Sequence, residues 1–128
     1  MTPDANITFG FAWICVGILL GAPMALSFLH ADWLGGYGSL DRRLLRLAHV
    51  AFIMLSLLNV IYGYAWKTGS LGTFPQRAAS AGLIAGAVLL PLTLLAGIRV
   101  KRLLWFLPVP FTLVFCAMLS AAIGRLLP

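Results

Sequence analysis

The sequence predicts an all-α protein: a single integral membrane domain over residues 1–128 that forms a four-transmembrane-helix bundle. Two observations predict this fold class. Of the 128 residues, 62% are hydrophobic and only 9% are charged, whereas a soluble domain is about half apolar and about a quarter charged. The chain also contains four continuous apolar runs, each close to the roughly 20 residues that a helix needs to cross the hydrocarbon core. The expected helices are 7–29, 47–66, 78–98 and about 105–124.

The apolar runs are predicted to be helices because they are continuous. In lipid, a segment must satisfy its own backbone hydrogen bonds, which only helices and closed barrels achieve. Barrel strands would show alternating polarity over about 10 residues, but stretches such as AFIMLSLLNVIYGYAW (51–66) do not alternate. The mean hydropathy of +1.02 agrees with a chain that lies mostly in the membrane.

Local features define the individual helices. Residues 1–10 carry no Lys or Arg, so 7–29 is expected to be a retained helix rather than a signal peptide. Pro23 is expected to bend the first helix and Pro91 the helix 78–98. Because proline lacks a backbone donor and disfavours helix before it, Pro108 and Pro110 predict a break. We expect 101–107 to lie at the interface and the fourth span to start near Pro110.

The distribution of basic residues predicts the orientation. Short cytoplasmic loops collect Lys and Arg, and six of the nine basic residues fall on one side of the four predicted spans. These six are Arg42, Arg43, Arg46, Arg99, Lys101 and Arg102, whereas Lys67, Arg77 and Arg125 fall on the other side. Both termini are therefore expected on the non-cytoplasmic side, in a multi-pass protein of the bacterial inner membrane. The net charge of +6 then indicates contact with anionic lipid head groups, not nucleic acid.

Small residues predict where helices pack. Gly17 and Gly21 are one turn apart in the first span, and Gly82 and Gly86 are one turn apart in the third. Such pairs let two backbones approach closely in a membrane. The sequence leaves open whether the small face of 78–98 packs inside the bundle or against a partner subunit.

A polar stripe follows one face of the second span. At 100° per residue, His49, Ser56 and Asn59 fall on the same face as Arg42. Polar groups inside a span face the bundle or a partner more often than lipid, so this face is expected to be buried.

Several functional classes are disfavoured. No Asp, Glu, Lys or Arg lies in the middle of a predicted span, whereas coupled pumps and exchangers usually carry an ionisable group there. The chain also lacks a recognisable nucleophile motif or phosphate-binding glycine loop, so we do not expect an enzyme acting alone.

Residues 30–49 hold the densest set of polar side chains, and His30 and His49 are predicted to lie at the same depth. Three interpretations are open. The histidines could be structural. They could be axial ligands of a b-type haem, with Arg42, Arg43 or Arg46 near its propionates. Alternatively, His30, Asp32 and His49 could bind a metal. A quinone pocket is a further alternative.

The two cysteines are predicted to lie at matching depths, Cys15 in the first span and Cys116 in the fourth. We expect both to pack as small apolar side chains. A Cu(I) site of Cys15, Cys116 and Met118 is a less favoured alternative.

The segment HADWLGGYGSLDRRLLRLAHVAFIMLSLLNVIYG (30–63) resembles a set of small bacterial four-helix integral membrane proteins of uncharacterised function. The shared pattern is H…W-GGY-S…RR-LRL-H. The residues that carry it here are His30, Trp33, Tyr37, Arg42, Arg43, Arg46 and His49. The resemblance covers about a quarter of the chain. It implies a bacterial inner-membrane protein and a loop between the first two helices that matters for function, but no activity.

Together these features predict a small accessory or interaction subunit of a larger inner-membrane assembly, such as a respiratory or other electron-transfer complex. One alternative is a b-type cytochrome or a quinone-linked electron carrier built on His30 and His49. Another is a homo-oligomeric pore or carrier lined by Ser56 and Asn59. The expected partners are membrane lipids and either a protein partner or further copies of the chain.

Overall fold

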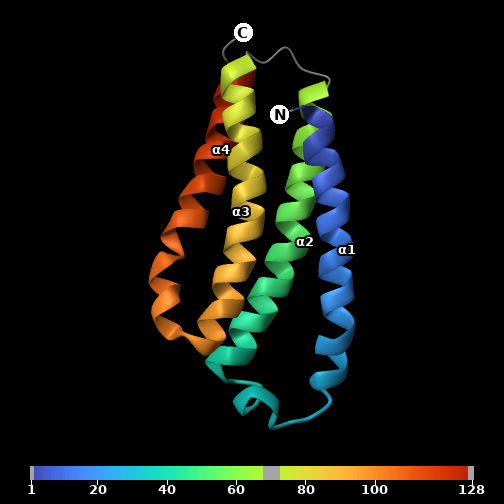
Figure 1. Ribbon diagram of the computed structural model, residues 1–128, viewed down its shortest axis with the longest axis vertical. Coiled ribbons are helices and arrows are strands. Elements are labelled where there is room, and N and C mark those ends of the chain that lie inside the picture. The colour runs from blue at the N-terminus through green and yellow to red at the C-terminus, as the bar shows by residue number, and fades with distance from the viewer. Residues whose placement is uncertain (1, 68–72, 127–128) are drawn as a thin grey trace.

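A computed structural model describes residues 2–67 and 73–126. Within them the chain is helical and contains no strand (Figure 1). The elements, in chain order, are α1 (Pro3–Ser27), η1 (Trp33–Gly35), α2 (Leu40–Lys67), α3 (Thr73–Arg99), η2 (Lys101–Phe106) and α4 (Pro108–Leu126), where η marks a 3-10 helix. The described residues contain four helical segments long and apolar enough to cross a membrane. The all-α fold and the four membrane-spanning candidates are thus confirmed.

Three helices begin earlier than the hydropathy predicts, and one of them is α3, which begins at Thr73 rather than residue 78. α1 begins at Pro3 rather than residue 7, with proline at a first-turn position, where its missing N–H costs nothing, and Asp4 beside it. α2 begins at Leu40 rather than residue 47. The Ser39 hydroxyl caps this helix by accepting the Arg42 N–H at 3.2 Å. The arginines at its start are therefore helical residues.

The α-helix is interrupted between α3 and α4, just before the prolines that predict the break. Lys101–Phe106 forms the 3-10 helix η2, and the α-helix resumes at Pro108 rather than near Pro110. Proline at the first position of α4 needs no backbone donor, so the new helix can begin there. Trp105 is 87% exposed and Phe106 is 62% exposed. η2 therefore lies on the outside of the molecule.

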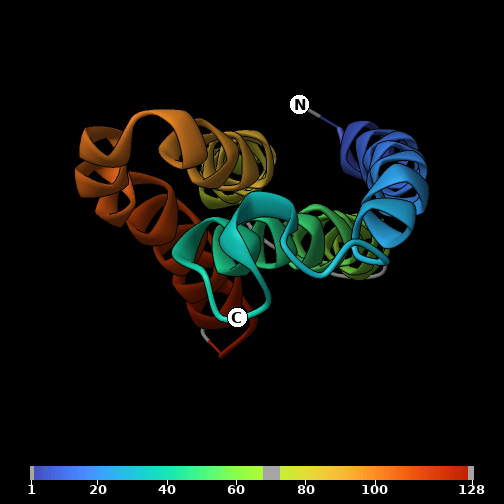
Figure 2. The same cartoon turned by 90° about the horizontal axis from the view of Figure 1, so that it is seen from below.

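The helices form a zigzag row rather than a closed square. α1 packs on α2, α2 on α3 and α3 on α4, with only slight contact between α1 and α3 (Figure 2). In the apolar part of each helix, 44% of the residues of α2 and 39% of those of α3 are buried inside the protein, but only 11% of those of α1. The two inner helices therefore form the core, and the outer ones leave most of their surface to lipid or a partner.

The core lies mainly between α2 and α3 and is rich in alanine and leucine. Its main cluster consists of Leu44, Ala48, Ala51, Leu55, Ala87, Leu90 and Leu94. A second cluster, Tyr62, Ala79, Leu83 and Ala117, attaches α4 near the end of the molecule where both termini lie (Figure 1). Small side chains at these contacts let the helices approach closely, as membrane helices require.

Glycines line the contact between α1 and α2. A Cβ on Gly10 would lie 2.5 Å from Cγ2 of Val60 and 2.7 Å from the carbonyl oxygen of Ser56. On the same seam, Gly17 lies against Ile53 and Gly21 against the ring of His49. The glycine pair of α3 meets α4 instead, with Gly82 against Ala117 and Gly86 against Val114. Both predicted pairs thus lie at contacts within the chain.

Candidate functional site

The segment between α1 and α2 is a folded corner built around one buried arginine. Arg42 is only 4% exposed. Its Nη2 donates to the carbonyl oxygens of His30 at 2.7 Å and Phe28 at 3.5 Å, and its Nη1 donates to that of Ala31 at 3.2 Å. These carbonyls follow the end of α1, where the helix dipole favours a cation. Arg42 therefore fastens the chain after α1 to the first turn of α2.

Two aromatic rings enclose this guanidinium. Its Cζ lies 5.0 Å from the centroid of Phe28 and 5.9 Å from that of Trp33, within the range of cation–π attraction. Its Nε has no hydrogen-bond partner among the described residues. Because its terminal nitrogens are already engaged, Arg42 cannot serve a haem propionate without giving up the corner.

A tight turn closes the corner. Leu34, Gly35 and Gly36 have φ angles of 53°, 80° and 86°, which glycine adopts without cost but a leucine does not. The Ser39 hydroxyl donates to the carbonyl oxygen of Leu34. Arg46 lies over the ring of Tyr37 with Cζ 4.6 Å from its centroid. The motif residues Trp33, Tyr37, Arg42 and Arg46 thus build one local structure.

The structure separates the two histidines that the sequence pairs. His30 is exposed in the corner, and Arg42 holds its backbone carbonyl. His49 lies seven residues after Arg42 in α2, about 10 Å further along the helix, where its ring packs on Gly21. The equal depth expected for the two side chains is therefore a misprediction, because α2 starts earlier and carries His49 into the bundle.

His49 borders a small apolar cavity of about 60 Å³. The residues around it are Leu20 and Met24 of α1, Leu45, Ala48, His49 and Phe52 of α2, and Leu95 of α3. Nδ1 of His49 is sealed from solvent and has no hydrogen-bond partner among the described residues. An unpaired buried polar atom is unusual enough to require an explanation.

These residues do not fit a b-type haem. The lining of the cavity at His49 does not include His30, and its volume is far below the roughly 300–1,000 Å³ of ligand pockets. The metal alternative also lacks a site, because within residues 2–67 and 73–126 no three His, Cys, Asp or Glu side chains form a metal-binding group. His30 and Asp32 are both exposed in the corner, away from His49.

The most buried polar groups form a network that links three helices. The Asn6 amide donates to Oδ1 of Asn59 at 2.8 Å, and the Ser80 hydroxyl donates to Oδ1 of Asn6. Nδ2 of Asn59 donates to the carbonyl oxygens of Leu55 at 2.9 Å and Leu83 at 3.3 Å. All three polar side chains are 0% exposed. α1, α2 and α3 are thereby fixed in register.

Sequence reasoning missed Asn6. The signal was its spacing. One face of α1 is marked by residues four, seven and four positions apart, namely Asn6, Gly10, Gly17 and Gly21. Trp13 lies on the same side of the helix, and its Nε1 donates to the carbonyl oxygen of Ala87 at 2.9 Å. The face of α1 that carries Asn6 and the glycines is therefore the face that packs against α2 and α3.

Ser56 and Asn59, the proposed pore lining, are both 0% exposed. The Ser56 hydroxyl donates to the carbonyl oxygen of Phe52 within α2. In this single chain both residues are part of the packing, as the helix-packing prediction for them requires.

The cysteines lie on the two outer helices, Cys15 on α1 and Cys116 on α4, and both are free and exposed. α1 and α4 are at opposite ends of the helix row (Figure 2). Cys15 is therefore not assembled with Cys116 and Met118 into a copper site within one chain.

A larger apolar groove of about 220 Å³ lies between α2 and α4, on the opposite side of the row from α1. Its lining is Leu58, Ile61, Tyr62, Ala65, Trp66, Met118, Ala121 and Ala122. The phenol of Tyr62 donates to the carbonyl oxygen of Gln76 at 2.8 Å. The groove therefore presents apolar surface with small alanine side chains from both helices, Ala65 of α2 and Ala121 and Ala122 of α4.

Comparison with known protein families, with curated proteins and with solved structures finds no match for this chain.

Proposed function

We propose that this protein is a small accessory subunit of a larger inner-membrane assembly and that a partner helix lies in the groove between α2 and α4. The observation that carries the proposal is this groove, about 220 Å³ of apolar space beside Ala65, Ala121 and Ala122. Small residues are typical of places where membrane helices meet. A respiratory or other electron-transfer complex is the class of assembly we favour.

The chemistry of the interior supports an interaction role. The amides of Asn6 and Asn59 and the hydroxyl of Ser80 bond to one another and to backbone carbonyls. Polar side chains that bond between helices in this way serve packing, which supports a role in assembly.

The experiment is purification of the tagged protein from native membranes in mild detergent, with the mass of the particle as the readout. We expect a particle with a stoichiometric partner. Ala122→Phe fills the groove and should release that partner. Ala22→Phe, at an exposed position of α1, makes the same change elsewhere and should retain it. A monomeric particle, or equal effects of the two variants, would contradict the proposal, and a particle of identical copies would favour the homo-oligomer alternative.

We place both termini on the non-cytoplasmic side of a bacterial inner membrane. The end of the molecule that carries the corner and η2 holds six of the nine basic residues, as a cytoplasmic rim does. With Cys15 and Cys116 replaced by alanine, Gly38→Cys should react with a membrane-impermeant maleimide only after permeabilisation. Thr2→Cys should react in intact cells, and the reverse pattern would invert the topology.

A second candidate function is quinone binding at His49. The observation that favours it is the sealed, unpartnered Nδ1 beside an apolar cavity between α1 and α3, because a buried imidazole can hydrogen-bond a quinone carbonyl. α1 would have to move outward, since a cavity of about 60 Å³ is smaller than a quinone ring requires. Quinone that co-purifies with the wild-type protein but not with His49→Leu would support this function. Equal quinone content in both would remove it.

A further inference from the structure

A second groove lies on the outer side of α3, where η2 folds back against it. It is an open groove of about 320 Å³, lined by Leu89, Leu92, Thr93 and Ala96 of α3 and by Leu103 and Phe106 of η2. The Thr93 hydroxyl donates to the carbonyl oxygen of Leu89 at 2.7 Å. The surface of this groove is therefore apolar in effect and suits a hydrocarbon chain.

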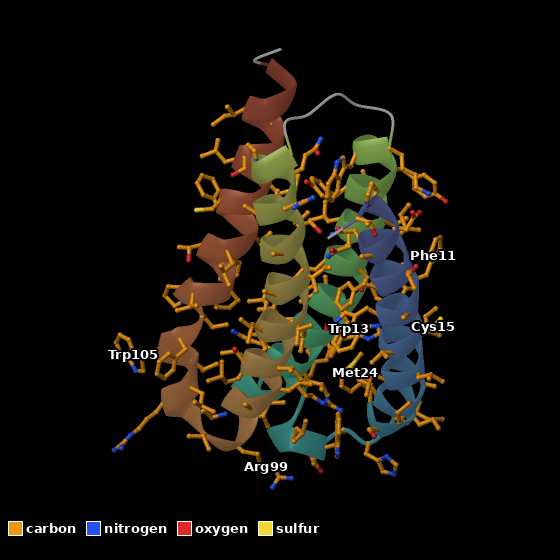
Figure 3. The ribbon with its side chains drawn as sticks, turned by 45° about the horizontal axis from the view of Figure 1, so that its top comes forward. Phe11, Trp13, Cys15, Met24, Arg99 and Trp105 are labelled. Atoms are coloured by element: carbon orange, nitrogen blue, oxygen red, sulfur yellow. The ribbon has the colours of Figure 1, made fainter. Side chains whose placement is uncertain are left out.

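Two cations lie just beyond one end of this groove. Arg99 is three residues after Ala96 and seven after Leu92, so it continues the same face of α3 by one turn. Figure 3 shows its side chain extending beyond the end of the helix. Arg102 follows at the start of η2, and both arginines are exposed. In the part of the chain that the structure describes, neither side chain takes part in a hydrogen bond or ion pair.

The neighbouring charges are already accounted for. Lys101, between the two arginines, pairs with Asp41 of α2 and also donates to the carbonyl oxygen of Ile98 at 3.2 Å. Asp41 is thus already paired with Lys101, and neither α3 nor η2 contains an acidic residue of its own. The positive charge of Arg99 and Arg102 has no counter-ion within these elements.

Trp105 indicates how deep this region lies. Its ring is 87% exposed and points away from the helices (Figure 3). Exposed tryptophans of membrane proteins collect at the level of the head groups. We infer from this tryptophan that Arg99 and Arg102 lie at head-group level, with the groove on the side of the hydrocarbon core.

We infer that this groove, together with Arg99 and Arg102, is a binding site for one anionic phospholipid. Its phosphate accepts hydrogen bonds from the two guanidinium groups, which suit phosphate oxygens in geometry and charge. One acyl chain lies in the groove along Leu92 and Ala96. A lipid fits better than a free phosphate, because the groove is apolar and Arg99 continues the face of α3 that lines it. The inference is independent of the accessory role proposed above.

The test measures lipid binding to the purified, delipidated full-length protein by native mass spectrometry, with phosphatidylglycerol and phosphatidylcholine of identical acyl chains. We expect one phosphatidylglycerol bound tightly per chain and weaker binding of phosphatidylcholine. Arg99→Gln combined with Arg102→Gln should weaken phosphatidylglycerol binding on the order of tenfold. The control is Arg43→Gln combined with Arg77→Gln, which removes the same charge from exposed positions elsewhere and should leave this binding unchanged.

A second variant tests the acyl-chain part of the site. Ala96→Phe keeps both arginines but fills the groove, and it should weaken phosphatidylglycerol binding several-fold while helicity is unchanged. Equal losses in the two arginine pairs would overturn the inference, since the attraction would then be diffuse. So would equal affinity for the two lipids, or displacement of the lipid by millimolar inorganic phosphate. The arginine variants change only exposed side chains, so their result does not depend on whether Ala96→Phe folds.

Discussion

The side-chain amide of Asn6 donates a hydrogen bond of 2.8 Å to the side-chain oxygen of Asn59, and this contact ties the first turns of α1 to the middle of α2. The two residues are 53 positions apart, and both are fully buried. Ser80 of α3 completes the network. Three helices that lipid alone would not hold in register are thus aligned by polar groups, which have no competing water partners in a membrane.

Replacement of Asn6 should therefore destabilise the fold. Asn6→Leu removes the donor to Asn59 and the acceptor of the Ser80 hydroxyl, and we expect a loss of about 1–2 kcal/mol in the free energy of unfolding. The measurement is a denaturation titration in bicelles. Thr8→Ala, an exposed change two residues away, should cost less than about 0.5 kcal/mol. Equal losses for the two variants would mean that the network contributes nothing specific.

The close approach of α1 to α2 at Gly10 predicts a steric penalty. In Gly10→Ala, the new methyl group would lie 2.7 Å from the Ser56 carbonyl oxygen, and a helix backbone yields less readily than a side chain. We expect a loss of about 1–3 kcal/mol from overpacking. Gly38→Ala meets no atom within 4 Å and serves as the control in the same titration. An unaltered stability of Gly10→Ala would show that the helices separate more easily than this contact implies.

Replacement of Arg42 should destabilise the corner between α1 and α2 rather than the whole fold. Arg42→Gln should loosen residues 28–39, because three carbonyl oxygens after α1 lose their charged donor. A hydrogen bond to a charged group contributes about 1.5–3 kcal/mol. We therefore expect the free energy of opening of the corner to fall by about 2 kcal/mol. Hydrogen exchange of this segment measures the change. Arg43→Gln, on the exposed side of the same turn, should leave the exchange rates as they are.

His49 should behave oppositely to the asparagines. Its Nδ1 is buried without a hydrogen-bond partner, so His49→Leu removes a desolvated polar atom and breaks no bond. We expect the free energy of unfolding to stay within about 0.5 kcal/mol of the wild-type value or to rise. Asn59→Leu, ten residues later in the same helix, should lower it by more than about 1 kcal/mol. A large loss for His49→Leu would indicate that the imidazole has a partner in the membrane.

The all-helical fold, the four spans and the break before α4 follow from hydropathy and from the positions of proline along the chain. Hydropathy and proline act locally, through the cost of unpaired backbone in lipid and the missing donor of proline, so these features follow from the order of residues. The glycine pairs could also be found this way, because a stripe of small residues shows where a helix can be approached.

Which helices meet, and which partners the polar residues find, depends on tertiary packing. Sequence spacing put His30 and His49 at one depth, but the cap at Ser39 starts α2 earlier and carries His49 against Gly21. Asn6, Asn59 and Ser80 come from three helices, and their meeting depends on how far each helix slides along its neighbour. That register is set by packing between distant segments, which residue order along one helix does not encode.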